Sequence, residues 1–163
     1  MSVLMKKIER AKWLQKEILA GEPVSADAIT INLRSKDNKI SFWEMEKGED
    51  IEDVLLAVIT NCDRVTASDI VIIDKEVIRK EGLTIEYEEG ITKVDDMKDK
   101  HRNVYDMDYN KLGILAKLIV EEFKKNEVKR YTRKQIIGII KNALNMERIN
   151  IADLKDSMAS EVI

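Results

Sequence analysis

The sequence of 163 residues is poor in several residue types that define classes of small proteins. Its single cysteine, Cys62, excludes a disulfide framework within the chain and a four-cysteine zinc site. Its single histidine, His101, would have to serve any hydrolase built on a histidine base. The longest apolar run, 54–59, is far shorter than the roughly 20 residues that cross a bilayer. These shortages favour a soluble protein in the reducing cytoplasm, without a membrane partner.

Glycine is also scarce, and the six glycines are dispersed along the chain. None belongs to a phosphate-binding loop of the GxxxxGK[ST] or GxGxxG type. The nucleophile-elbow pattern GxSxG is missing as well. We therefore expect no nucleotide cofactor and assign no catalytic residue. The sequence favours a protein that acts by binding, although active sites assembled in space leave no motif along the chain.

The first part of the chain, 1–108, has the patterns of an α+β core. An apolar stripe with helical spacing predicts a helix over 2–20, ended by Gly21 and Pro23. Apolar and polar residues then alternate on both sides of the turn-rich segment 35–38, which predicts a hairpin. Further elements are expected at 28–34 and 39–46 (the hairpin strands), 50–62 (a helix capped by Asp50), 70–73 (a buried strand), 75–80 (a helical turn), 83–88 (a strand) and 91–108 (a charged connector).

The second part, 109–163, has a purely helical pattern. Asp108 is placed to cap its first helix, Thr132 and Gln135 form a capping box for the second, and Asn150 can cap the last. The predicted fold is therefore α+β. It combines a small mixed or antiparallel sheet, with helices on one face, and a C-terminal three-helix segment. This segment forms either a bundle of its own or a layer on the same core.

Charge is unevenly distributed along a chain whose net charge is −3. Between 124 and 148 eight basic residues stand against two acidic ones, and the rest of the chain is acidic. Basic side chains beside a capped helix start can contact phosphates. The candidate nucleic-acid-binding residues are Lys129, Arg130, Arg133, Lys134 and Lys141.

Trp13 is the candidate for a partner-binding residue, because it lies almost opposite the apolar stripe of the first predicted helix. Either a second layer of the protein covers it, or it is exposed to a partner. The leading hypothesis is a non-catalytic protein that binds another protein or a second copy of itself. The alternative is a regulatory protein that binds nucleic acid through the basic C-terminal helices.

The acidic residues near His101 are the candidate for a metal site. Asp95, Asp96 and Asp99 precede the histidine, and carboxylates with one imidazole can bind a divalent cation. However, lysines alternate with these acids, and no HExxH or EF-hand pattern occurs. We therefore expect a solvated loop of alternating charge here and assign no metal site.

Overall fold

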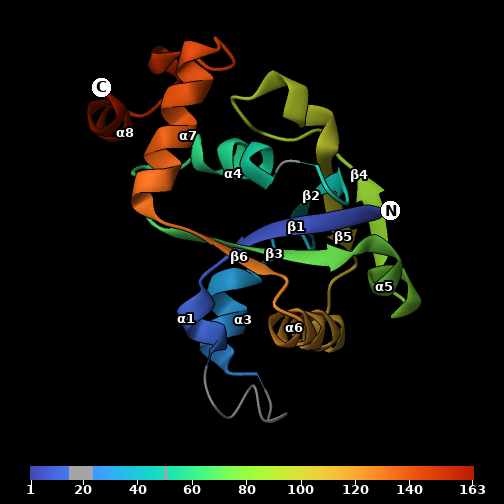
Figure 1. Cartoon of the computed structure of the whole chain (residues 1–163). Coiled ribbons are helices and arrows are strands. Elements are labelled where there is room, and N and C mark those ends of the chain that lie inside the picture. Colours follow the sequence, from blue (N-terminus) through green and yellow to red (C-terminus); the bar gives the residue numbers. More distant parts are fainter. Residues whose placement is uncertain (15–23, 50) are drawn as a thin grey trace.

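The computed structural model describes residues 1–14, 24–49 and 51–163 (Figure 1). Within these residues, the strands are β1 (Ser2–Ile8), β2 (Ile40–Glu46), β3 (Ser68–Asp74), β4 (Thr84–Tyr87), β5 (His101–Tyr105) and β6 (Val128–Tyr131). They form one antiparallel sheet in the order β4-β5-β2-β1-β3-β6. The predicted α+β class is confirmed, and the sheet is antiparallel throughout.

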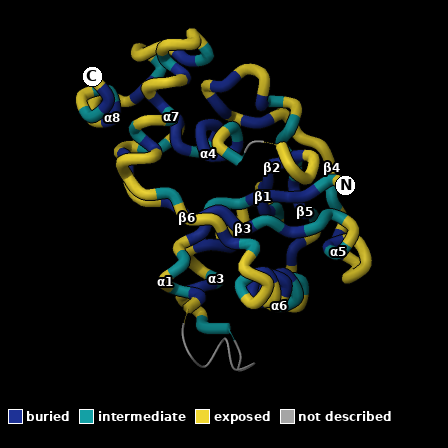
Figure 2. Tube along the Cα trace, in the orientation of Figure 1, coloured by how far each residue is buried: buried dark blue, intermediate teal, exposed yellow. Residues whose placement is uncertain are grey.

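Helices cover both faces of this sheet, where helices on one face were expected (Figures 1 and 2). One face carries α4 (Ile51–Ile59), α7 (Arg133–Asn145), α8 (Asp156–Val162) and the 3₁₀ helix η1 (Asp95–Lys100). The other face carries α1 (Arg10–Trp13), α3 (Ala26–Asn32), α5 (Lys75–Lys80) and α6 (Tyr109–Lys124). The C-terminal helices therefore lie on opposite faces, and both cores contain residues from 1–108 and from 109–163. None of the helices in the described ranges has the length and apolar character needed to cross a membrane.

The prediction of a helix over 2–20 is wrong, because residues 2–8 form the central strand β1. Val3 and Met5 pack into the core beneath α4, whereas Leu4 and Ile8 pack into the core beside α6. A strand that is buried on both faces has an apolar pattern that also fits a broad helical stripe. Gly21 and Pro23, the predicted ends of that helix, lie outside the described residues.

The prediction of the first hairpin strand, 28–34, is also wrong. Residues 26–32 form the helix α3, whose N-cap Ser25 accepts a hydrogen bond from the backbone N–H of Ala28 at 3.3 Å. The turn itself is real, because Asp37 and Asn38 have φ of 53° and 56° between two backbone hydrogen bonds that join Lys36 and Lys39. The second predicted strand is confirmed as β2.

The sequence analysis missed two short strands that lie in charged segments. The predicted connector 91–108 contains η1 and β5, and β6 lies between the two long C-terminal helices. The expected helices α4, α6 and α7, the buried strand β3 and the short elements α5 and β4 are confirmed. The caps at Asp108 and Thr132 are present as predicted, and Asp50 lies outside the described residues. The last predicted helix divides into the 3₁₀ helix η2 (Ile151–Asp153), capped by Asn150, and α8.

Candidate ligand-binding cleft

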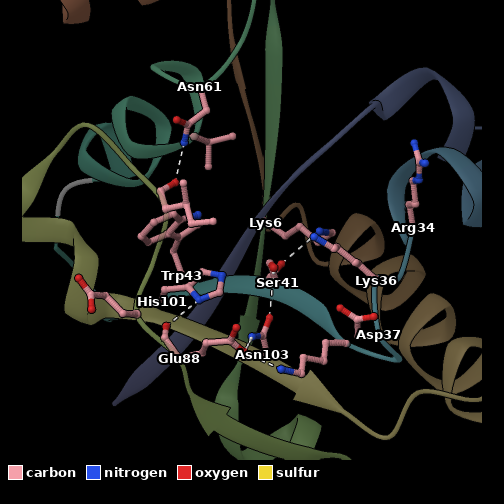
Figure 3. Close-up of a pocket in the computed structure, with 14 residues that line it drawn as sticks. Lys6, Arg34, Lys36, Asp37, Ser41, Trp43, Asn61, Glu88, His101 and Asn103 are labelled. Atoms are coloured by element: carbon pink, nitrogen blue, oxygen red, sulfur yellow. Dashed lines mark hydrogen bonds and ion pairs between the residues drawn. The ribbon is translucent and has the colours of Figure 1, made fainter. Parts of the chain in front are cut away.

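A cleft opens where the two central strands β1 and β2 separate. They pair only from Ser2↔Glu46 to Met5↔Trp43. Beyond that point Lys6–Ile8 pair with β3 alone, and Ile40–Phe42 pair with β5 alone. Figure 3 shows the ribbon of β1 diverging from that of β2 at Lys6. The resulting β1–β2 cleft has two adjoining parts, of about 470 Å³ and about 290 Å³, which share Lys6, Arg34 and Trp43. We name the larger part, lined by His101, the outer part, and the smaller part, lined by Lys7, the inner part.

Lys6 spans the point at which the strands separate. Its Nζ donates a hydrogen bond to the backbone oxygen of Ser41 at 3.1 Å and lies 5.5 Å from the centroid of the Phe42 ring. Burial lowers the pKa of Lys6 to about 8, and no carboxylate of the described residues offsets this effect. A half-buried ammonium group without a counter-ion therefore lies at the centre of the cleft.

The remaining charges differ between the two parts of the cleft. Lys7 and Arg34 line the inner part beside Lys6, and no acidic side chain among the described residues lines that part. Lys36 reaches into the outer part, where Figure 3 shows it with Arg34 and Asp37 on the side opposite His101. Asp37, Glu88 and Glu89 all line the outer part, so the inner part has the larger excess of basic over acidic residues among those described.

One wall of the cleft is a hydrogen-bonded network around Glu88. Its Oε2 accepts from Lys39 Nζ at 2.9 Å, from Asn103 Nδ2 at 2.7 Å and from Tyr105 Oη at 2.9 Å. The hydrogen bonds from Lys39 and Tyr105 lower the pKa of the Glu88 carboxyl. This carboxylate is therefore engaged by its own neighbours and does not neutralise Lys6.

His101 contacts both this network and the ring of Trp43. Its Nδ1 lies 2.8 Å from the backbone oxygen of Glu88, and because a carbonyl only accepts, Nδ1 carries the proton. Burial, with smaller effects from the charges of Arg102 and Lys6, lowers the pKa of His101. The imidazole is therefore neutral at pH 7, with Nε2 as an acceptor. Its ring meets that of Trp43 edge to face, with 5.2 Å between centroids.

Gly90 lets the segment after β4 close over this aromatic pair. A Cβ atom at Gly90 would lie 2.7 Å from Cη2 of Trp43 and 2.9 Å from Cβ of His101. The Gly90 N–H donates to the backbone oxygen of Lys98 at 2.8 Å, which holds the segment in place. Only glycine fits between this backbone and the buried indole.

We expect Gly90→Ala to destabilise the fold by about 1–3 kcal/mol, because neither the buried Trp43 ring nor the His101 Cβ can move aside freely. The measurement is the free energy of unfolding in urea. The matched control is Gly138→Ala in α7, where no atom lies within 4 Å of the added Cβ, so that variant should gain about 0.5–1 kcal/mol. Equal stability of the two variants would contradict the close packing at Gly90.

The five predicted nucleic-acid-binding residues fall into two groups, those with an ion-pair partner and those without one among the described residues. Arg130 pairs with the buried Asp69 at 3.2 Å, and Arg133 pairs with Glu161 at 2.8 Å. The other three residues are exposed and, within the described ranges, take part in no ion pair: Lys129 on the edge strand β6, and Lys134 and Lys141 on α7. Two of the five candidates thus have a structural role.

Trp13 is completely buried, at 0% exposed. Its ring stacks on Phe123 of α6, with 6.4 Å between centroids and an interplanar angle of 24°. A second layer therefore covers Trp13, which was one of the two readings of its position in the sequence. It is not available to a partner in this fold.

The acidic residues before His101 are engaged by basic side chains. Asp95 pairs with Lys98 at 2.6 Å, and Asp96 pairs with Arg148 at 2.8 Å. Arg148 also binds Asp53 of α4 at 2.5 Å, so it joins three segments. Among the described residues, no three His, Cys, Asp or Glu side chains gather as a metal site would require. His101 faces the β1–β2 cleft instead.

The sequence analysis did not identify the cleft. The one signal of the cleft in the sequence was the pair Lys6–Lys7 inside the apolar segment 3–8. Two adjacent lysines in a buried strand are costly unless their ammonium groups reach solvent or a partner. The separation of β1 from β2 that opens the cleft has no local signature in the sequence.

The comparisons with known proteins give no family. No family model matches the chain, and no curated protein or solved structure matches it significantly.

Proposed function

We propose that this is a small, non-catalytic binding protein that holds an anionic small molecule in the β1–β2 cleft. The observation that carries the proposal is Lys6, a half-buried ammonium group at the point where two central strands separate, with no carboxylate partner in the described part of the chain. A desolvated charge without a counter-ion raises the free energy of the empty protein. An anion in the cleft would remove that cost and raise the pKa of Lys6 again.

The surroundings of Lys6 favour a small ligand with a polar or charged group and an apolar part. Lys7 and Arg34 add positive charge to the inner part of the cleft. Trp43 and the exposed Ile91 supply apolar surface on the outer part. A concave site with a few convergent polar groups on an apolar lining is typical of small-molecule sites.

The test uses the fluorescence of Trp43. The chain has two tryptophans, so Trp13→Phe leaves Trp43 as the single reporter, inside the cleft. We expect inorganic phosphate and pyrophosphate to change its emission in a saturable way. Lys6→Met in this background should weaken binding at least about tenfold, because a hydrogen bond to a charged group contributes roughly 1.5–3 kcal/mol.

The matched control is Lys117→Met, which removes the same charge from an exposed position on α6. It should bind both anions as the parent does. Binding that is equal in the Lys6 and Lys117 variants, or no saturable signal at millimolar anion, would refute the proposal.

A second candidate function is nucleic-acid binding through Lys129, Lys134 and Lys141. The observation that favours it is their exposure without an acidic partner among the described residues, on β6 and α7. Three phosphate contacts predict that affinity for labelled duplex DNA falls roughly 40-fold between 50 and 200 mM salt.

This candidate is tested by fluorescence anisotropy with the triple variant Lys129→Glu, Lys134→Glu and Lys141→Glu. We expect it to lose binding, because three phosphate contacts become repulsive. The control changes three exposed lysines elsewhere, Lys80, Lys93 and Lys117, to glutamate, with the same change in net charge. Equal loss in both variants would mean that only net charge matters and that these three lysines form no site.

Association with a protein partner or a second copy is a further proposal without a mapped surface. Trp13, the residue first considered for it, is buried.

A further inference from the structure

We propose that Lys6 captures a small anionic aldehyde or ketone in the β1–β2 cleft as a reversible imine. This inference rests on the proposed function and deepens it, because it names the class of ligand. The anionic group of the ligand would lie against Arg34 and Lys7, and its carbonyl carbon would lie at Nζ of Lys6.

The first support is the position of the amine. Lys6 lines both parts of the cleft, so its Nζ is reachable from the outer and the inner part. One N–H is directed to the backbone oxygen of Ser41 at 3.1 Å. When the amine is neutral, this bond uses one hydrogen and leaves the nitrogen lone pair for an electrophile.

The second support is the contrast with Lys39 in the same cleft. Lys39 donates to Glu88 at 2.9 Å, and this carboxylate raises the pKa of Lys39 and keeps it an ammonium. Lys6 has no carboxylate among the described residues, and burial lowers its pKa to about 8. Part of the Lys6 population is therefore a neutral amine at pH 7.5, which is the nucleophilic form.

The third support is the charge beside the amine. Lys7 and Arg34 line the inner part of the cleft with Lys6, without an acidic side chain among the described residues there. They can hold a phosphate or carboxylate beside the Lys6 nitrogen. Neutral His101 adds no charge, and its Nε2 offers an acceptor on the opposite wall.

The reaction balances without an added oxidant or reductant. The Lys6 nitrogen lone pair forms a bond to the carbonyl carbon, the C=O π pair moves to oxygen, and one proton passes from the nitrogen to that oxygen. The carbinolamine then loses its hydroxyl group and the remaining N–H hydrogen as one water molecule. The product is a C=N bond to Nζ, and water reverses the step.

The experiment uses pyridoxal 5′-phosphate as a probe that carries both an aldehyde and an anion. The full chain is incubated with it at pH 7.5, the imine is reduced with borohydride, and the adducts are located by peptide mapping. We expect one adduct per chain on Lys6, formed at least about tenfold faster than on the exposed Lys117. The rate at Lys6 should level off at a lower pH than the rates at surface lysines, because burial lowers the pKa of its amine.

Two analogues of pyridoxal 5′-phosphate test the contributions of its phosphate and its aldehyde separately. Pyridoxal lacks the phosphate and should label Lys6 at least about tenfold more slowly, because one charge-assisted contact contributes roughly 1.5–3 kcal/mol. Pyridoxine 5′-phosphate lacks the aldehyde and should quench Trp43 and protect Lys6 from labelling. Lys6→Arg keeps the cation without the nucleophile, so it should bind this phosphate and form no adduct.

The outcomes distinguish the two proposals. If pyridoxine 5′-phosphate binds at Trp43 but the aldehyde labels Lys6 no faster than Lys117, the imine is overturned and the anion site stands. If neither compound binds in the cleft, both proposals fail. Selective labelling that persists equally with pyridoxal would also overturn the role of the anionic group.

Discussion

Trp13→Ala is expected to lower the free energy of unfolding by about 3–5 kcal/mol, which is a large part of the stability of a domain this size. The indole at the end of α1 is completely buried and stacks on Phe123 of α6. Its removal leaves a cavity in the core that also contains Leu115 and Ile119. The measurement is urea unfolding followed by far-UV circular dichroism, which does not depend on the tryptophan itself.

Trp13→Phe is the control for this prediction. It keeps an aromatic ring against Phe123 and should cost much less than the alanine variant. The indole Nε1 has no hydrogen-bond partner among the described residues, so the smaller ring loses no hydrogen bond seen there. A Trp13→Ala protein as stable as the parent would mean that the side chain is not part of the core. Trp13 would then again be a candidate for a partner-binding residue.

Glu44→Gln is expected to destabilise the protein by about 2–3 kcal/mol at pH 7. The Glu44 carboxylate pairs with Lys75 and, at 2.5 Å, with Nε of Arg102, and Ser2 donates to it as well. Its side chain is only 14% exposed, and those of Lys75 and Arg102 are 15% and 21% exposed. Neutralising the shared carboxylate leaves two poorly solvated cations together, which costs more than an exposed ion pair is worth.

The effect of Glu44 should depend on pH in a defined direction. Burial alone would raise its pKa, but the hydrogen bonds from Lys75 and Ser2 and the charge of Arg102 outweigh burial and lower it below 4.5. The contribution of the ionised carboxylate is therefore complete above about pH 4.5 and is lost as pH falls through the lower pKa of the folded protein. The stability difference between the parent and Glu44→Gln should shrink over that acid range.

The control carboxylate is Glu76, which pairs with Arg79 at 2.6 Å with both side chains at least half exposed. Because solvent screens such a pair, Glu76→Gln should change the stability by no more than about 0.5 kcal/mol at any pH. A Glu44 variant that behaves like the Glu76 variant would show that the partly buried group of Glu44, Lys75 and Arg102 contributes nothing beyond a surface ion pair.

Helices with their own local signals could be predicted from the sequence. The capping box of Thr132 and Gln135 and the stripe that includes Ile136 and Ile140 identify α7, because cap and apolar spacing agree. Short strands were harder to predict. In β6, the adjacent basic residues Lys129 and Arg130 interrupt any alternation of apolar and polar residues, and only pairing with β3 makes this segment a strand.

The candidate site could hardly be predicted. Lys6 lies within the helix predicted over 2–20, and His101 was considered as a candidate ligand only with the acidic residues that precede it. In the fold these two residues line one cleft with Trp43, although they come from β1 and β5 on either side of β2. Their meeting follows from the strand order, which no local pattern encodes.

The sequence by itself determined the α+β class, most of the helices and the uneven distribution of charge. These follow from composition, caps and periodicity within about 15 residues of chain. Only the tertiary structure decided that residues 2–8 form a central strand, that Trp13 is covered, and that Lys6 reaches Ser41 in a strand 35 residues away. The physical reason is that pairing and burial depend on contacts between distant segments. An apolar stretch therefore has no fixed structure until its partners are in place.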